Sequence, residues 1–303
     1  MTDSTGSSIV VVGSINADLT TNVQRHPAPG ETLLGSGGTV SAGGKGANQA
    51  VAAAQLGAKV TMVGAVGSDQ MAGDALAHMR ESGADLSAIA TVDGPTGLAV
   101  ITVSEDGENT IIVIPGANAT INANYVEEHS QLIADAGIVL LQGEIPADGF
   151  DRTVELAQGR VVINLAPVVP VGHDQLRQAD PLLVNEHEGA LVLDMLDAPA
   201  DTTDPEELVT ALLEQGFASV VMTLGAEGAL VGTPGKLSEI PTPKITAVDT
   251  TGSGDAFAGA LVAKLAAGET LIDAATFAAR VGAYAATKPG AQASYPTLTS
   301  ELP

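Results

Sequence analysis

Short apolar runs alternate with alanine-rich, helix-forming segments along most of this chain. The runs are apolar on both faces, which is typical of parallel strands that lie between two layers of helices. We expect strands at residues 9–12, 60–66, 138–141, 161–164, 182–184 and 220–224. We expect helices at residues 47–56, 71–82, 123–134, 148–157, 205–215 and 256–267. This alternation predicts an α/β fold with a mainly parallel sheet, in which ligands bind beyond the carboxyl ends of the strands.

Two segments lack the helical alternation. Residues 19–40 alternate polar and apolar side chains, and residues 98–114 have the pattern of a β-hairpin with a turn at 104–107. We assign both to a small separate β-sheet, whose exposed face needs cover from a ligand, the main domain or another subunit. The predicted core then comprises residues 1–16, 42–96 and 116–303, and the small sheet comprises residues 17–41 and 97–115.

The composition excludes several functional classes. The 303 residues include 36 Asp and Glu against 12 Lys and Arg, a formal charge of −24, which repels nucleic acid and anionic lipid. Because the chain has no cysteine, disulfides, thiol catalysis and iron–sulfur clusters are excluded. Residues 1–6 lack the pattern of a signal peptide, and no apolar run approaches the ~20 residues that span a bilayer. We expect a soluble, cytoplasmic protein with no nucleic-acid or membrane partner.

Two polar clusters near the N-terminus are candidates for ligand binding. Asn16 and Asp18 follow the first predicted strand, where their side chains can hold sugar hydroxyls. The glycine-rich segment 43–48 lets the backbone approach a ligand and offers Lys45 and Asn48 as polar groups. Its spacing is not that of a P-loop, and no Gly-x-Gly-x-x-Gly follows a strand. An Asx turn and an ordinary glycine-rich helix start explain the same residues without a ligand.

Two later clusters point to phosphate chemistry. Residues 252–254, Gly-Ser-Gly, precede an alanine-rich helix whose free N–H groups form an anion site. Asp255 lies at the same helix end, where a carboxylate repels phosphate. A general base for an attacking hydroxyl explains its presence there, although an N-cap also fits. Asn185 and Glu188 follow another predicted strand and could reach Mg²⁺ through waters, or could be solvated surface groups.

The order of these clusters resembles that of the ribokinase-like (phosphofructokinase-B type) carbohydrate kinases. The resemblance extends from residue 9 to about residue 296. Segments 43–50 and 252–255 are similar to the two signatures of the family, and segments 107–109, 115–118 and 290–292 also resemble it. The resemblance implies a three-layer α/β fold with a small β-sheet lid and transfer of the ATP γ-phosphoryl to the 5-hydroxyl of D-ribose. It also implies Mg²⁺, K⁺ or another monovalent cation as activator, and a homodimer formed through the lids.

The resemblance further implies a role for each matching residue. Asp255 would be the general base, Gly252, Ser253 and Gly254 would form the anion hole, and Asn185 and Glu188 would hold Mg²⁺ through waters. The residues implied to bind the sugar are Asn16, Asp18, Gly43, Gly44, Lys45, Asn48, Glu144 and Asp255. The residues implied to bind ATP are Asn185, Glu188, Thr223, Gly225, Ala226, Glu227, Gly228 and Gly254. The monovalent cation would lie near Asp249, Thr251, Ala285, Lys288, Gly290 and Ser294.

Three alternatives stay open at this point. The first is a kinase of the same family for 2-deoxyribose, fructose or a nucleoside, of which the nucleoside is disfavoured because the chain has only 3 Tyr, 4 Phe and no Trp for stacking. The second is a non-catalytic sugar sensor on the same fold, which would gain nothing from a carboxylate at Asp255. The third is a Rossmann-type oxidoreductase, which the missing glycine fingerprint disfavours.

Overall fold

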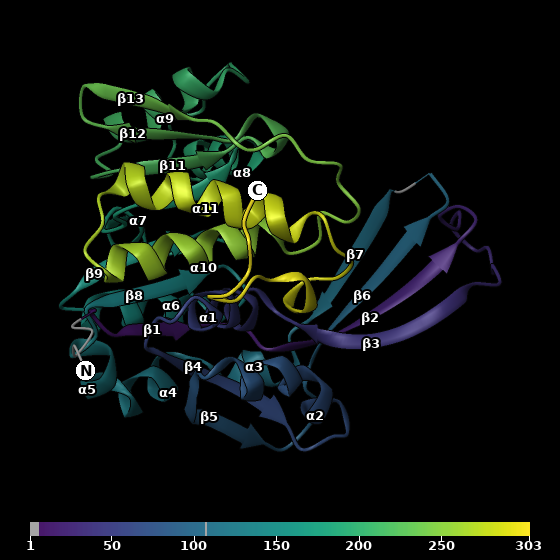
Figure 1. Ribbon diagram of the computed structural model, residues 1–303. Helices are drawn as coiled ribbons and strands as arrows, with labels where there is room; N and C mark the ends of the chain where they lie inside the picture. Colours follow the sequence, from purple (N-terminus) through teal and green to yellow (C-terminus); the bar gives the residue numbers. More distant parts are fainter. Residues whose placement is uncertain (1–5, 107) are drawn as a thin grey trace.

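The computed structural model of this chain describes residues 6–106 and 108–303. Its centre is a nine-stranded sheet with the order β13-β12-β11-β10-β9-β8-β1-β4-β5 (Figure 1). The strands β11, β10, β9, β8, β1, β4 and β5 pair in parallel with their neighbours, and β12 and β13 add an antiparallel edge. The strands are β1 (Ile9–Val12), β4 (Val60–Gly67), β5 (Asp85–Val92), β8 (Ile138–Gln142), β9 (Arg160–Asn164), β10 (Leu182–Asn185), β11 (Val220–Thr223), β12 (Ala229–Thr233) and β13 (Lys236–Ile240).

Helices cover both faces of the large sheet. In β1, Ile9 and Val11 pack into one hydrophobic core, whereas Val10 and Val12 pack into the other, so the strand is buried on both faces. The first core includes residues of α1 (Lys45–Gln55), α2 (Met71–Ala75), α3 (Ala77–Ser82), α10 (Ser253–Ala266) and α11 (Leu271–Ala285). The second includes residues of α4 (Ala123–Glu128), α5 (Ser130–Ala134), α6 (Ala147–Leu156), α7 (His173–Leu176), α8 (Glu186–Met195) and α9 (Pro205–Glu214). The three-layer α/β fold predicted from the sequence is therefore confirmed.

A four-stranded sheet projects beyond the carboxyl end of β1 (Figure 1). Its strands are β2 (Asn16–Val23), β3 (Ser36–Gly43), β6 (Gly97–Ser104) and β7 (Asn109–Ile114), in the order β3-β2-β6-β7. β6 and β7 form the predicted antiparallel hairpin, and β2 pairs in parallel with β6. The assignment of residues 17–41 and 97–115 to one separate structural unit remains a proposal.

The predicted elements are present, but the sequence pattern missed breaks and edges. The predicted helix 71–82 is interrupted at Leu76 to give α2 and α3, and helix 123–134 is interrupted at His129 to give α4 and α5. The edge strands β5 and β13 were not predicted, because their side chains alternate in exposure and carry polar groups. β12, α7, α8 and α11 were also not predicted as elements. The residues 1–5 of the signal-peptide argument and Gly107 of the predicted turn and of motif 107–109 lie outside the described residues.

The small sheet presents apolar side chains to solvent on its edge strand. Every residue of β7 is exposed, and Ile111 and Ile112 are 53% and 61% accessible. An edge strand with such side chains has both unpaired backbone groups and apolar area available to a partner.

In the part of the chain that the structure describes, no helix combines the length and the apolarity that crossing a membrane requires.

Candidate active site

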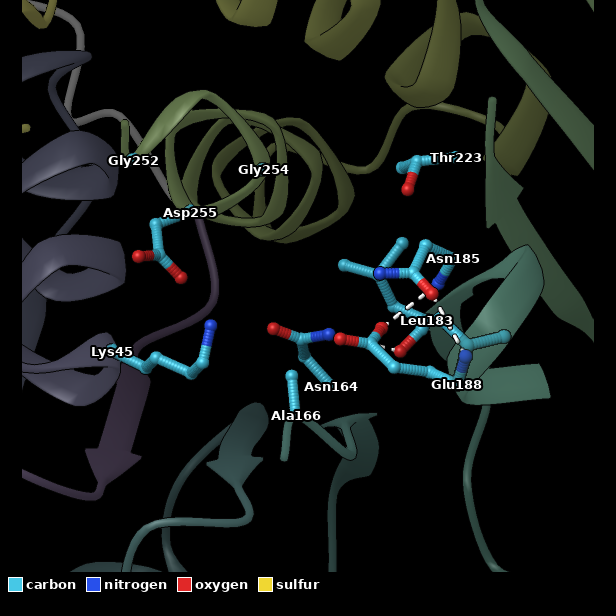
Figure 2. A pocket seen from close by; sticks show the side chains of 11 residues that line it. Lys45, Asn164, Ala166, Leu183, Asn185, Glu188, Thr223, Gly252, Gly254 and Asp255 are labelled. Carbon is cyan, nitrogen blue, oxygen red and sulfur yellow. Dashed lines mark hydrogen bonds between the residues drawn. The ribbon is translucent and has the colours of Figure 1, made fainter. Parts of the chain in front are cut away.

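A pocket of about 150 Å³ lies at the carboxyl ends of β9, β10 and β11, next to the start of α10 (Figure 2). Figure 2 shows Lys45 and Asp255 on one side of the pocket and Asn185, Glu188 and Thr223 on the other. It is lined by Lys45, Asn164, Ala166, Leu183, Val184, Asn185, Glu188, Thr223, Gly252, Gly254 and Asp255. The structure thus brings together seven of the residues predicted for phosphate transfer, sugar binding and Mg²⁺: Lys45, Asn185, Glu188, Thr223, Gly252, Gly254 and Asp255.

The glycine-rich segment holds the start of α1 against the end of β1. Gly44 has a φ of 87°, and a Cβ there would lie 2.7 Å from the Asn16 nitrogen, so only glycine fits. Glu144 ties the segment down, because its Oε2 accepts hydrogen bonds from the Ser14 hydroxyl at 2.5 Å and from the Lys45 N–H at 3.1 Å. Glu144 therefore supports the backbone of the loop as well as facing the predicted sugar side.

Asp18 lies where the small sheet meets the core. A Cβ on Gly43 would collide with the Asp18 carboxyl group, so glycine makes room for it. The Asp18 Oδ1 atom is buried and has no hydrogen-bond partner among the described residues. Burial, together with the nearby carboxylates of Glu144 and Asp255, raises the pKa of Asp18 to about 7, against the opposing effect of Lys45. An unpartnered carboxyl oxygen is available to accept a ligand hydroxyl.

Asp255 is fixed by two amide side chains. Asn48 donates to its Oδ2 at 2.9 Å, and Gln49 donates to its Oδ1 at 2.8 Å. Both donors lie on the first turn of α1, so this turn and the first turn of α10 meet at the carboxylate. The Asp255 carboxylate also raises the pKa of the Lys45 ammonium, with smaller effects from Glu144, Glu188 and Asp18, and burial opposes them. Lys45 is thus a cation at the centre of an acidic site.

The start of α10 is open toward the pocket. Gly252 has a φ of 72°, and its carbonyl accepts a hydrogen bond from the Tyr295 hydroxyl at 3.1 Å. A Cβ on Gly254 would have no heavy atom within 4 Å, so packing inside the chain does not require glycine at this position. Ser253 turns its hydroxyl back to the Thr250 carbonyl at 2.8 Å. Free N–H groups in a first helical turn without side-chain caps can hold an anion.

Asn185 and Glu188 form the cap of α8. Asn185 Oδ1 accepts from the Glu188 N–H at 2.8 Å, and Glu188 Oε2 accepts from the Asn185 N–H at 2.9 Å, which is a capping box. The pKa of Glu188 is raised, mainly by burial, against the opposing effects of the Asn185 N–H and Lys45. The cap leaves Glu188 Oε1 free of this pair, so one carboxylate oxygen is available on the pocket side.

The predicted nucleotide loop follows β11. Residues Gly225–Glu227 form a short 3₁₀ helix, η2, and the Leu224 N–H donates to the Gly228 carbonyl at 2.8 Å. Thr223 lines the pocket described above, whereas Glu227 lines a separate hollow beside α9, β12 and β13. The structure therefore places Thr223 beside Asn185 in the same pocket as Glu188 and leaves Gly225, Ala226, Glu227 and Gly228 outside that pocket.

Of the residues predicted for a monovalent cation, Asp249, Thr251, Lys288 and Gly290 lie on two neighbouring loops, Ala285 ends α11, and Ser294 lies in the short 3₁₀ helix Gln292–Ser294. Asp249 joins the two loops, because its carboxylate accepts from the Gly290 N–H at 2.8 Å and from the Thr251 N–H at 2.9 Å. Burial favours the neutral form, but these hydrogen bonds together lower the pKa of Asp249. Ser294 is buried, and the Lys288 ammonium turns to the Tyr284 hydroxyl at 2.6 Å. Among the described residues, no group of three or more His, Asp or Glu side chains is placed to hold a metal ion.

Sequence reasoning missed a set of buried amides around Asp255. Gln49 follows Asn48 directly, but its role depends on contacts with residues far away in the chain, which no local motif shows. Asn164 and Val184 end predicted strands, and that position was the available signal. The residues near the site that received no role from the sequence are Ser14, Gln49, Asn118, Gln142, Asn164, Ala166, Leu183, Val184, Gln292 and Tyr295. Among them, Gln49, Asn118 and Gln292 lie in segments that resemble the family.

Comparisons with known proteins identify the family of the chain. The family model of pfkB family carbohydrate kinases matches residues 7–298. A ribokinase of Schizosaccharomyces pombe is 35% identical over 302 residues, covering 96% of this chain and 95% of the relative. A deoxyribokinase of Salmonella typhi is 30% identical, covering 96% of each chain. The structure of Arabidopsis thaliana ribokinase complexed with ribose and ATP superposes with a TM-score of 0.87 at 30% identity, covering 97% of this chain and 96% of that one. The chain therefore belongs to the pfkB family of carbohydrate kinases, and the prediction of an ATP-dependent sugar kinase is confirmed.

Proposed function

We propose that this protein transfers the γ-phosphoryl group of ATP to the 5-hydroxyl of D-ribose, giving ribose 5-phosphate and ADP. The observation that carries the proposal is the position of Asp255. Its carboxylate lies at the start of α10, between the sugar-side residues Asp18 and Asn48 and the pocket that holds Glu188 and Thr223. The similarity to a ribokinase complexed with ribose and ATP supports the same substrates.

The sugar would bind between the root of the small sheet and the start of α1. The Asp18 carboxylate would accept hydrogen bonds from the sugar hydroxyls, and the Asn16 amide would donate or accept them. Lys45 and Asn48 would form further hydrogen bonds with the sugar. Gly43 and Gly44 would let the ring approach the backbone. Because Asp18 Oδ1 has no partner among the described residues, a sugar hydroxyl would supply the hydrogen bond that this buried oxygen lacks.

Asp255 would act as the general base. Each of its carboxylate oxygens accepts one amide hydrogen bond and keeps a second lone pair for the 5-hydroxyl. As that hydroxyl oxygen attacks the γ-phosphorus, its proton passes to Asp255 and ADP leaves. The N–H groups after Gly252 and the Lys45 ammonium would stabilise the charge that develops on the transferred group.

The residues present fit the cations that such a reaction needs. Glu188 Oε1 and Asn185 offer oxygen atoms on the pocket side and would hold Mg²⁺ through waters. The loops that Asp249 joins offer a carboxylate and backbone carbonyls, a donor set that suits a monovalent cation such as K⁺. When bound, Mg²⁺ neutralises phosphate charge, and a monovalent cation beside residues 249–251 would fix the shape of the loop that leads into α10.

A kinase for 2-deoxyribose is the second candidate. The deoxyribokinase relative covers the chain as fully as the ribokinase relative does, at 30% against 35% identity. The two sugars differ by one hydroxyl, so discrimination depends on contacts at a single position.

A cytoplasmic location also stays a prediction, which cell fractionation tests.

The exposed β7 edge supports a homodimer formed through the small sheets. A second copy of the chain would cover Ile111 and Ile112 and pair with the free edge. A partner at this edge would also explain why apolar side chains of β7 face solvent on a chain whose formal charge is −24.

Substrate specificity is tested by ADP release from ATP–Mg²⁺ with a panel of sugars, with and without K⁺. We expect D-ribose to give the highest kcat/KM and K⁺ to raise it. Preference for 2-deoxyribose or fructose would contradict the substrate while leaving the reaction class intact. Sugar binding without ADP release from any sugar would favour the non-catalytic sensor.

The role of Asp255 is tested by Asp255→Asn. General-base catalysis contributes roughly 10²–10⁴-fold, so we expect kcat to fall by about that factor, with the thermal midpoint and sugar affinity retained. Steady-state kinetics measure kcat, thermal unfolding measures the midpoint, and calorimetry measures the sugar affinity. A near-native kcat in a folded variant would exclude Asp255 as the base.

Sugar binding is expected to depend on pH through Asp18. With its pKa at about 7, this carboxyl group is protonated below neutral pH and ionised above it. Because the ionised group accepts hydrogen bonds from two sugar hydroxyls, affinity should be highest above pH 7 and fall by about tenfold per unit below it. Calorimetry across pH measures this, and Asp18→Asn should bind weakly with a flat profile. The same pH dependence in both proteins would contradict the assignment.

The dimer is tested by Ile112→Lys in sedimentation analysis. A charge at the centre of the exposed strand should convert a wild-type dimer to monomer. Leu298→Lys is the control, because Leu298 is a highly exposed apolar residue outside the small sheet and should not change the assembly. A monomeric wild-type protein would contradict the proposal.

A further inference from the structure

Gln49 is a fully buried side chain whose amide connects three elements. Its Nε2 donates to Asp255 Oδ1 and to Asn164 Oδ1, both at 2.8 Å. Its Oε1 accepts from Gln142 Nε2 at 2.7 Å. Both Nε2 hydrogens are therefore used, and the amide plane is fixed between α1, the ends of β8 and β9, and the start of α10.

A second amide chain reaches the same carboxylate from the other side. Gln292 Nε2 donates to Asn48 Oδ1 at 2.8 Å, and Asn48 Nδ2 donates to Asp255 Oδ2 at 2.9 Å. We call these chains the Gln142–Gln49 relay and the Gln292–Asn48 relay. Each carboxylate oxygen of Asp255 thus ends one relay.

The charge of Asp255 dictates the direction of both relays. An ionised carboxylate only accepts hydrogen bonds, so Gln49 and Asn48 must turn their NH₂ groups toward it. Their carbonyl oxygens then face outward and require a donor, which orients Gln142 and Gln292 in the same sense. The Oε1 atoms of these two terminal amides are left without a partner among the described residues, although the side chains are only 0% and 2% exposed.

The unpartnered oxygens indicate that the direction of the relays matters. Flipping Gln142 would offer its NH₂ elsewhere but would place two carbonyl oxygens against each other. The chain instead leaves a buried acceptor unsatisfied at each end, which costs free energy. Space is also provided for this arrangement, because a Cβ on Gly13 would collide with Gln142 Oε1.

We propose that the Gln142–Gln49 relay, assisted by the Gln292–Asn48 relay, positions the Asp255 carboxylate for proton transfer. Gln49 and Gln142 are positioning residues, since neither lines the pocket and both act through Asp255. Their aligned amide dipoles stabilise the ionised carboxylate and fix which lone pair faces the sugar hydroxyl. The inference rests on the proposed role of Asp255 as general base.

The test uses Gln142→Glu, which changes one group that does not contact Asp255. A carboxylate at position 142 cannot donate to Gln49 Oε1, so Gln49 turns its NH₂ toward it and withdraws its hydrogen bond from Asp255. Gln49→Glu removes the same donor directly. The matched control is Gln55→Glu, because Gln55 lies on the same helix α1 and outside both relays. ADP release with D-ribose and ATP–Mg²⁺ gives kcat and KM, and thermal unfolding reports folding.

We expect Gln142→Glu and Gln49→Glu to lower kcat by about tenfold to a hundredfold, since small errors of placement have effects of this size. The KM for ribose should stay within about threefold of the wild type, and Gln55→Glu should match the wild type. Should Gln49→Glu fail to fold, Gln142→Glu alone decides.

Native kcat in both folded variants would overturn the proposal. A rise in KM without a fall in kcat, or unfolding of both variants, would also overturn it, because the amides would then serve sugar binding or core stability. Asp255→Asn separates this failure from that of the proposed function. If Asp255→Asn loses turnover while the relay variants keep it, only the relay is wrong. If Asp255→Asn keeps turnover, the general base itself is wrong.

Discussion

Burial of one carboxylate, that of Asp255, determines how the helices around the site must pack. A carboxylate removed from water is costly unless hydrogen bonds replace its hydration, and Asn48 and Gln49 supply them. Both donors lie on α1, so α1 must approach α10 closely. Gly259 permits this approach, because a Cβ there would lie 2.6 Å from the Gln49 carbonyl oxygen. The position of the carboxylate and the contact between the two helices are therefore one constraint.

The predicted sugar side draws on both sheets. Asn16 and Gly43 pair with each other at the root of the small sheet, and Asp18 follows two residues later on β2. Displacing this sheet would move Asp18 while leaving Asp255 in place on α10. The raised pKa of Asp18 and its unpartnered Oδ1 atom indicate a carboxyl group whose burial disfavours the ionised form. A sugar hydroxyl that hydrogen-bonds to this oxygen, as we propose, would couple sugar binding to the position of the small sheet.

The sequence predicted what local patterns record. Buried parallel strands appear as continuous apolar runs, and Gly252–Asp255 appears as glycines before an alanine-rich helix, so both could be located in advance. The relay residues could not, because Gln142 and Gln292 meet the first turn of α1 only after the chain folds. Edge strand β5 was missed for a related reason: its half-exposed residues carry no continuous apolar signal. Helix breaks at Leu76 and His129 leave no glycine or proline to mark them.

The acidic surface conflicts with a nucleotide substrate, because a chain with a formal charge of −24 repels ATP. Distance resolves this conflict. Exposed charges are screened over about 8 Å at physiological salt, so most of the 36 acids act weakly on a ligand inside the pocket. Groups within the pocket act at full strength, and there the Lys45 ammonium and the open start of α10 favour an anion, whereas the carboxylates of Asp255 and Glu188 oppose it. The surface charge therefore acts on the approach of the nucleotide, whereas the phosphate position that we propose depends on Lys45 and the helix start.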